Sequence, residues 1–130
     1  MNVVIDTSAI IAVIANEPEK KRLIKLTSGY DLIAPTSIYW EVGNAFSAMF
    51  KRKQATLKQA KDGISIFKKI PIRFLDVDLT DAIELSNKYN IYAYDAYVIS
   101  CALKHKCSLI SLDFKLLEVS KQAKVTIMEV

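Results

Sequence analysis

Cysteine, histidine, glycine and proline are all scarce in this chain of 130 residues, which holds two Cys, one His, three Gly and three Pro. So little Gly and Pro argues against a loop-rich or disordered chain. Cys101 and Cys107 form no CxxC pair and have only His105 nearby, which makes a poor zinc set and a poor disulfide framework. We therefore expect reduced thiols that pack as small apolar side chains in a cytoplasmic protein. A single His also argues against most Ser-His and Cys-His hydrolases.

Long hydrophobic runs and glycine-rich phosphate loops are absent as well. No apolar run reaches the roughly 20 residues that span a bilayer, and the segment MNVVIDTSAIIAVIANEPEK lacks the basic start of a signal peptide. The sequence thus predicts no membrane partner. It contains no GxGxxG and no P-loop, so nucleotide binding of those kinds is not expected. Asp6 also lacks the second Asp, two residues later, of a haloacid-dehalogenase-type phosphatase.

Short apolar segments rich in β-branched residues alternate with segments of helical periodicity along the chain. The pattern predicts strands at residues 2–6, 32–34, 73–77, 108–111 and 125–128. It predicts helices at residues 8–15, 16–28, 36–53, 57–69, 80–90, 94–106 and 114–120. Apolar strands without period-2 alternation, separated by helices, are typical of a parallel sheet covered on both faces. We predict an α/β fold in one domain spanning residues 1–130.

Positive charge is concentrated in the middle of the chain. The net charge is +4, but residues 20–73 hold twelve Lys and Arg against three acids. Such a segment fits a face that binds a polyanion. It also fits a set of solvated helix faces, so charge alone leaves both interpretations open.

Four acidic residues stand in unusually apolar or aromatic surroundings: Asp6 in VVIDTS, Glu41 in SIYWEVGNAF, Asp95 in YAYDAYVIS and Asp113 in LISLDFKLL. Each has a purely structural explanation. Asp6 and Asp113 could cap the helices that follow them. Asp95 could complement the dipole of a first helical turn, and Glu41 could be partly exposed in mid-helix. If the four acids have no common role, these four explanations must all hold at once.

The alternative is that the four acids form one metal site. Two of them follow predicted strands, where parallel α/β folds bind ligands, and the other two stand on helices that can reach the same edge. Carboxylates that close would raise one another's pKa values unless cations bind. Mg²⁺ and Mn²⁺ prefer oxygen ligands, and such a site can activate water and stabilise a phosphodiester transition state. Ser8 and Asn44 could add neutral polar contacts to a phosphate.

The motifs VVIDTSAII, APTSIYWEVGNAF, YAYDAYVISCALKH and LISLDFKLLEVSKQAKVTI together resemble PIN domains, most closely the VapC-type toxins of toxin–antitoxin pairs, over nearly the whole chain. The resemblance implies a three-layer α/β/α sandwich with a short parallel central sheet. It also implies that a set of four acids binds Mg²⁺ or Mn²⁺ and cuts RNA. The implied catalytic metal ligands are Asp6, Glu41, Asp95 and Asp113, and the implied polar support comes from Ser8, Asn44 and Ser111.

The last motif departs from the commonest family pattern. Ser111 replaces the usual Thr and keeps its hydroxyl. Leu116 stands where an aromatic residue is usual, and Phe114 follows the last acid directly. Three tyrosines surround Asp95, namely Tyr92, Tyr94 and Tyr97. They could stack on bases, but the sequence favours packing in or against the core.

The resemblance implies a metal-dependent endoribonuclease that is the toxin of a type II toxin–antitoxin pair. Its substrate would be RNA, its partner a cognate antitoxin protein, and its assembly a homodimer. Lys51, Arg52 and Lys53 would then be candidate contacts of RNA phosphates. Two alternatives stay open: a PIN-fold module that binds RNA or protein without cutting, and a stand-alone RNA-processing or DNA-directed nuclease without an antitoxin.

Overall fold

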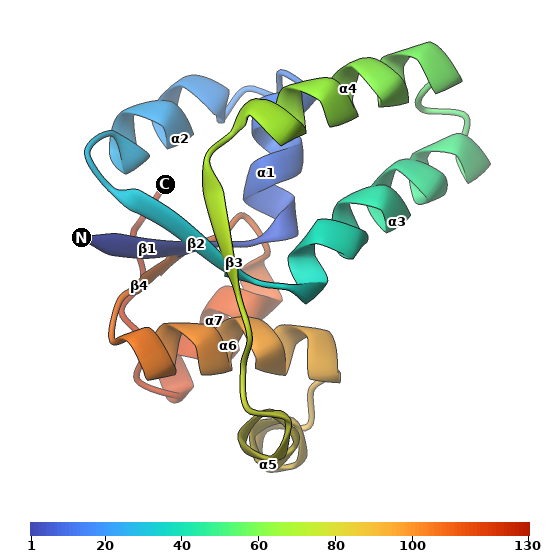
Figure 1. Cartoon of the computed structure of the whole chain (residues 1–130). Helices are drawn as coiled ribbons and strands as arrows, with labels where there is room; N and C mark the ends of the chain where they lie inside the picture. The colour runs from blue at the N-terminus through green and yellow to red at the C-terminus, as the bar shows by residue number, and fades with distance from the viewer.

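The structure of the protein, a computed structural model, describes residues 1–130. Four strands and seven helices alternate along the chain (Figure 1). Their bounds are β1 (Asn2–Ile5), α1 (Thr7–Ile14), α2 (Lys20–Thr27), β2 (Asp31–Pro35), α3 (Ser37–Lys51), α4 (Leu57–Lys69), β3 (Ile72–Leu75), α5 (Leu79–Tyr89), α6 (Ala93–His105), β4 (Ser108–Ile110) and α7 (Phe114–Gln122).

The four strands form one parallel sheet in the order β3-β2-β1-β4. In the centre of this sheet Val4 of β1 aligns with Ile33 of β2 on one side and Leu109 of β4 on the other. Figure 1 shows α1, α2 and α4 on one face of the sheet and α5, α6 and α7 on the other, with α3 beside α1. The predicted three-layer α/β/α sandwich with a short parallel sheet is therefore confirmed.

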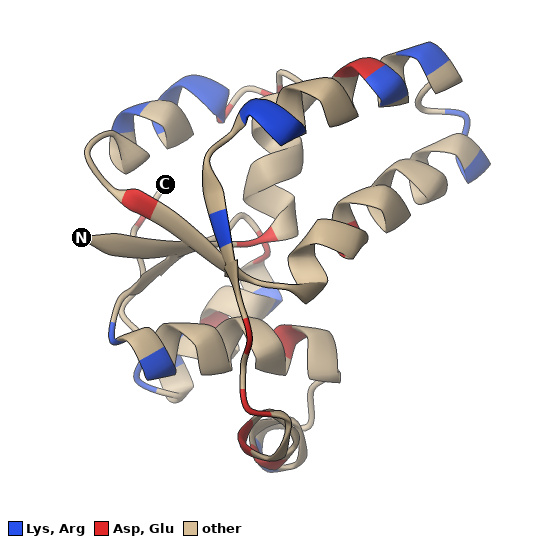
Figure 2. Cartoon of the chain, in the orientation of Figure 1, with Lys and Arg blue, Asp and Glu red and all other residues tan.

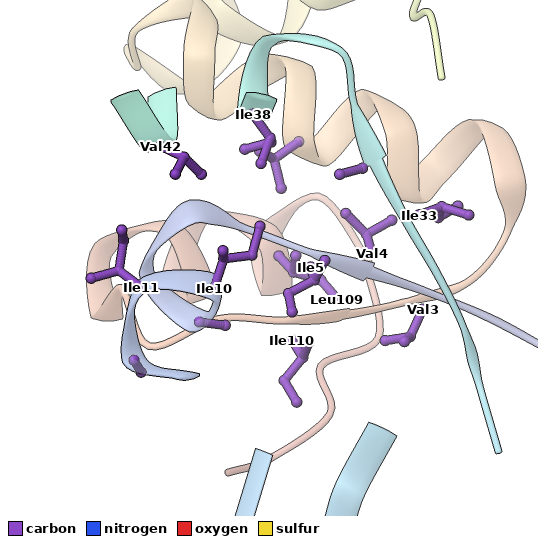
Figure 3. Packing of buried hydrophobic residues seen from close by; sticks show 14 of the residues in the cluster. Val3, Val4, Ile5, Ile10, Ile11, Ile33, Ile38, Val42, Leu109 and Ile110 are labelled. Carbon is purple, nitrogen blue, oxygen red and sulfur yellow. The ribbon is translucent and has the colours of Figure 1, made fainter. Parts of the chain in front are cut away.

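One apolar cluster of 24 buried residues joins the three layers. Its centre is the middle strand, where Val3 and Val4 are fully buried, and their neighbours Ile33 and Leu109 are equally inaccessible (Figure 3). A central parallel strand is covered on both faces, so each of its side chains meets helices or neighbouring strands whichever way it points. This explains the continuous apolar run that opens the chain.

The strand order fixes where a ligand site can form. The chain passes from β1 outward to β2 and β3, and then returns to place β4 on the other side of β1. The helix after β1 and the helix after β4 accordingly leave toward opposite faces (Figure 1). Parallel α/β sheets bind ligands beyond the carboxyl ends of strands at such a reversal. Asp6 directly follows β1, and Ser111 directly follows β4.

Two predicted elements differ from the structure by more than two residues. The helix expected at residues 16–28 begins only at Lys20, because Asn16 adopts a left-handed φ of +56° and turns precede the helix. The strand expected at residues 125–128 is reduced to one parallel bridge between Leu109 and Ile127. Two backbone hydrogen bonds hold that bridge at the outer edge of β4, too few to extend the sheet by a strand.

Neither cysteine forms a disulfide. Cys101 is buried within α6, and burial raises the pKa of its thiol to about 12. Cys107 is half-buried beside the core. The thiols therefore pack as small apolar groups, as predicted. None of the helices is both long enough and apolar enough to cross a bilayer.

Candidate acidic site

Asp6 is the centre of a hydrogen-bond network that joins the two central strand ends. Asp6 is only 5 % exposed, and its carboxylate caps α1 by accepting from the Ala9 amide at 3.1 Å. The Ser8 hydroxyl donates to it at 2.8 Å, and the Ser111 hydroxyl donates to it at 2.6 Å. The predicted polar supports Ser8 and Ser111 thus both contact Asp6, one from each side of the strand reversal.

The same two serines also bind the turn that follows β4. The Leu112 amide donates to Ser8 Oγ, and the Asp113 amide donates to Ser111 Oγ, each at 2.9 Å. Ser8 therefore holds the β4–α7 turn from α1, while Ser111 holds both its own turn and Asp6. The network positions Asp113 next to the end of β1, although 107 positions separate the two acids in sequence.

Burial dominates the electrostatics of Asp6. It raises the pKa of the Asp6 carboxyl above its ordinary value, and the charge of Asp113 adds to that rise. Hydrogen bonds from Ser111, the Ala9 amide and Ser8 act in the opposite direction without cancelling it. Because a buried carboxylate with a raised pKa is short of positive partners, the site would be relieved by a cation.

Asp113 caps a helix and Asp95 lies in a first helical turn, as their structural explanations predicted. Asp113 is exposed and caps α7 by accepting from the Leu116 amide at 3.1 Å. Asp95 is half-buried in the first turn of α6. Burial raises the pKa of Asp95, the charge of Asp113 raises it further, and Lys115 lowers it. Capping and proximity to other acids therefore occur together, so the structural explanation does not exclude a site.

Glu41 lacks any hydrogen-bond partner for a buried oxygen. Its Oε2 atom is inaccessible to solvent and unpaired in α3. Burial raises the pKa of Glu41 to about 7, and the charges of Asp6 and Asp95 contribute to the rise. The Ser37 hydroxyl acts in the opposite direction, although it makes no well-formed hydrogen bond. An unpaired buried carboxylate oxygen is costly, and a cation or an incoming donor would satisfy it.

The mutual repulsions connect all four acids in a ring: Asp6 with Asp113, Asp113 with Asp95, Asp95 with Glu41, and Glu41 with Asp6. Figure 2 shows the acidic segments at the β1–α1 junction, in α3 and at the start of α6 around the carboxyl-end edge of the sheet. However, no group of three His, Cys, Asp or Glu side chains is arranged to hold a metal ion directly. The acids thus share one region without forming a closed coordination cage.

The other predicted site residues lie further out. Asn44 is exposed and makes no side-chain hydrogen bond. Lys51, Arg52 and Lys53 are exposed at the end of α3, about 15 Å along the helix axis from Glu41 at 1.5 Å per residue. Figure 2 shows this basic segment at the far tip where α3 meets α4. It does not surround the acids.

Two features near the acids were not predicted. Lys115 is the cation that acts on Asp95, and its place two residues after a capping acid could have identified it. The tyrosines before Asp95 were expected to pack, yet Tyr92 is 86 % exposed and Tyr94 is 58 % exposed. That expectation is wrong for both, because they stand at the open start of α6; only Tyr97 is partly buried.

Comparison with known proteins agrees with this fold. The family model of the PIN domain matches residues 3–122, and the chain belongs to that family. No curated protein matches it in sequence. Among solved structures, it is similar to PAE2754 from Pyrobaculum aerophilum, with 19 % identity and a TM-score of 0.74, covering 98 % of this chain and 83 % of that one.

Two further solved structures share the fold. VapBC2 from Rickettsia felis, bound to a DNA fragment from its promoter, is 14 % identical with a TM-score of 0.72, covering 98 % of each chain. VapC20 from Mycobacterium tuberculosis, a Sarcin-Ricin loop cleaving toxin, is 13 % identical with a TM-score of 0.64, covering 89 % of this chain and 93 % of that one. At such identities the likeness concerns the fold.

Proposed function

We propose that this protein is a metal-dependent endoribonuclease that hydrolyses RNA phosphodiester bonds and acts as the toxin of a type II toxin–antitoxin pair. Membership of the PIN domain family supports a nuclease. The observation that carries the proposal is Glu41, whose buried Oε2 atom has no partner and whose neighbours in the electrostatic ring are also carboxylates. A folded protein retains such a costly arrangement when a ligand compensates it.

The donor set fits Mg²⁺ or Mn²⁺, since all four acids offer hard oxygen ligands. Asp6, Glu41, Asp95 and Asp113 would hold the ion, directly or through water. Mg²⁺ commonly binds through one or two carboxylates, several waters and substrate phosphates, so an open set without a preformed cage suits it. When bound, the ion would supply activation of the attacking water and neutralisation of charge on the phosphate.

The chain's own residues would orient the carboxylates and attract the phosphate of the RNA. Ser8 and Ser111 fix the Asp6 carboxylate by hydrogen bonds from both sides. The caps of α1 and α7 fix the directions of Asp6 and Asp113, because each carboxylate also accepts from a backbone amide. Lys115, exposed beside Asp113, is placed to attract a phosphate. Preorganised groups of this kind reduce the reorganisation that the reaction requires.

The proposed substrate and protein partners are suggested by the solved structures that share the fold. The VapBC2 structure is bound to a DNA fragment from its promoter, and VapC20 is named as a toxin that cleaves the Sarcin-Ricin loop. For this chain we accordingly propose an RNA substrate, a cognate antitoxin protein and a homodimer. A short reading frame beside its gene that encodes a small DNA-binding protein, whose co-expression relieves growth arrest, would support the antitoxin.

The decisive experiment is an RNA cleavage assay. Purified protein is incubated with labelled RNA in Mg²⁺, in Mn²⁺ and in EDTA, beside Asp6→Asn and Asp95→Asn. Glu84→Gln is the matched control, because Glu84 is an exposed acid of α5 outside the electrostatic ring. We expect cleavage only with metal, its loss in both Asn variants, and its retention in the control. Activity that survives chelation and both substitutions would overturn the proposal.

A binding module without catalysis is the second candidate. It is favoured by one observation: no three acids converge on a common metal position. This candidate predicts tight RNA binding that is equal in Mg²⁺ and in EDTA, with intact RNA after long incubation. The same samples, analysed by gel shift and by denaturing gel, therefore decide between the two functions.

A further inference from the structure

Exposed aromatic rings gather beside the acids. The chain has twelve Phe, Trp and Tyr residues, and only four of them are more than half exposed: Trp40 at 75 %, Tyr92 at 86 %, Tyr94 at 58 % and Phe114 at 81 %. Each of the four lies within three positions of Glu41, Asp95 or Asp113. Aromatic rings usually bury most of their area on folding, so exposure confined to this region calls for a ligand.

Three of these rings are immediate sequence neighbours of an acid. Trp40 precedes Glu41, Tyr94 precedes Asp95, and Phe114 follows Asp113. Trp40 and Tyr94 lie within helices α3 and α6, where successive residues point about 100° apart, so each ring projects to the side of its acid. Phe114 begins α7 directly after the cap residue Asp113. Three different helices therefore carry an exposed ring next to three of the four acids.

Two of the three rings are held in place by other aromatic residues. Trp40 packs edge to face with Tyr39, with ring centroids 4.9 Å apart and planes at 81°. Tyr39 in turn packs against the rings of Phe67 and Phe74, and each of these ring centroids lies 5.7 Å from that of Tyr39. Tyr94 packs edge to face with Tyr97, with centroids 5.9 Å apart. Such contacts use at most one face of a ring and leave the other face for a ligand.

We infer that Trp40, Tyr94 and Phe114 are positioning residues on which unpaired bases of the RNA stack while its phosphate lies at the acids. The inference rests on the proposed function. Aromatic side chains stack with every base and tolerate any sequence, and the exposed Lys115 beside Phe114 supplies a cation for the adjoining phosphate. Stacking requires splayed bases, so these rings favour unpaired segments over continuous duplex.

A protein partner is the competing occupant of the rings. Protein contacts commonly use contiguous apolar patches, whereas each ring here stands next to a carboxylate. Covering the rings with an apolar protein surface would also bring that surface against the carboxylates next to them, which would lose water without gaining a partner. RNA brings bases for the rings together with phosphates and their cations for the acids, and so satisfies both kinds of group.

Trp40 is the only tryptophan of the chain, so its fluorescence reports contact at one known ring. The Asp6→Asn protein, which the proposed function expects not to cleave, is titrated in Mg²⁺ with single-stranded oligouridylate, with an abasic strand of the same length, and with duplex RNA. We expect strong quenching by the single strand and little by the abasic strand or the duplex. Equal quenching and equal affinity for the abasic strand would overturn the inference, because phosphates alone would then account for binding.

Substitutions test the three rings separately from the acids. Trp40→Leu, Tyr94→Leu and Phe114→Leu should each weaken binding of labelled single-stranded RNA by about 5- to 100-fold. Trp40→Phe should restore most of the loss. Tyr30→Leu is the matched control, since Tyr30 is an aromatic residue exposed next to β2, away from the acids. All four rings are exposed, so circular dichroism should show an intact fold.

Failure of the inference differs from failure of the proposed function. Unchanged RNA affinity in all three Leu variants, with metal-dependent cleavage intact, refutes base stacking on the rings and is consistent with the proposed nuclease activity. Base-dependent binding of RNA without cleavage in Mg²⁺ or Mn²⁺ refutes the proposed nuclease activity and supports base stacking on the rings. Unchanged RNA affinity together with loss of self-association in analytical ultracentrifugation assigns the rings to a protein contact and overturns the inference.

Discussion

The Ser111 hydroxyl donates a 2.6 Å hydrogen bond to Asp6 across 105 positions of sequence. It also accepts from the Asp113 amide, so one small side chain joins the ends of two neighbouring strands. Ser111→Ala removes one hydrogen bond of the buried Asp6 carboxylate, which keeps those from Ser8 and Ala9, and leaves the Asp113 amide without its partner. We expect a loss of about 1–3 kcal/mol in the free energy of unfolding, measured by urea denaturation.

Two variants check the specificity of that loss. Ser111→Thr keeps the hydroxyl and should retain most of the stability. Ser65→Ala removes an exposed hydroxyl of α4 that bonds only the Lys61 carbonyl, and should change stability by less than about 0.5 kcal/mol. An equally small effect of Ser111→Ala would show that the bond contributes nothing net.

Asp6→Asn separates the capping role from the chemical role. Asn caps helices about as well as Asp, and the substitution removes a charge whose burial is unfavourable. We expect the unfolding free energy to stay within about 1 kcal/mol of wild type while RNA cleavage is lost. Asp6→Ala should lose cleavage and in addition about 1 kcal/mol of capping energy. Full specific activity of folded Asp6→Asn would restrict Asp6 to capping.

Stability of the metal-free protein should fall as pH rises toward neutrality. Burial raises the pKa of Glu41 from its ordinary 4.5 to about 7, so the folded state binds more protons than the unfolded chain between these values. The unfolding free energy therefore decreases through this window and levels off above it. Solvent screening of a half-exposed group limits the decrease to about 1–2 kcal/mol.

The origin of that slope is tested by Glu41→Gln. Urea denaturation in EDTA at pH 5, 6, 7 and 8 should give a flatter profile for the variant than for wild type. Some slope should persist, because burial raises the pKa values of Asp6 and Asp95 in the same direction. Superimposable profiles would assign the whole slope to other groups.

Metal binding should stabilise the fold independently of catalysis. A ligand that binds only the folded state at 100 times its Kd adds about 2.7 kcal/mol. Mg²⁺ and Mn²⁺ should thus raise Tm of the wild type in a concentration-dependent way, as recorded by thermal denaturation. Asp95→Asn should reduce the shift, and the control Glu84→Gln should keep it. A Tm insensitive to both ions would argue against a metal site.

The basic tip at residues 51–53 should act at long range. Because it lies about 15 Å along α3 from Glu41, its charges steer RNA without touching the cleaved bond. Neutralising Lys51 and Lys53 should weaken binding similarly for all sequences, and should lower the slope of log affinity against log salt by about 0.7 for each lost phosphate contact on single strands. A slope equal to that of wild type would exclude these contacts.

Much of the fold was predictable because it depends on local pattern. The apolar strand opening at Val3 and the helical periodicity around Val42 require no knowledge of distant residues, and both elements are present. The failures have tertiary or backbone causes. The turn at Asn16 depends on a left-handed residue, and residues 125–128 were limited to a bridge because strand pairing depends on a distant partner.

The acidic residues of the candidate site could be named from the sequence, but the hydrogen bonds that hold them could not. Apolar or aromatic surroundings in the sequence identified the four acids as candidates, and in the structure their charges act on one another. The bonds from Ser111 to Asp6 and from Leu112 to Ser8 join residues more than 100 positions apart, and one sequence gives no such pairings. Exposure of Tyr92 was missed for a similar reason, since only the folded surface shows that nothing covers it.

The position of β4 beside β1 has a consequence for synthesis of the chain. The first acid emerges at residue 6, but its partner strand and Asp113 are translated more than a hundred residues later. At about 5–20 residues per second, the ribosome completes that interval in roughly 5–20 seconds. Until then the group of four acids lacks Asp113 and the strand β4, even if the earlier helices have already folded. A ribonuclease built in this order would be harmless to the ribosome and message that produce it until β4 and Asp113 have been made.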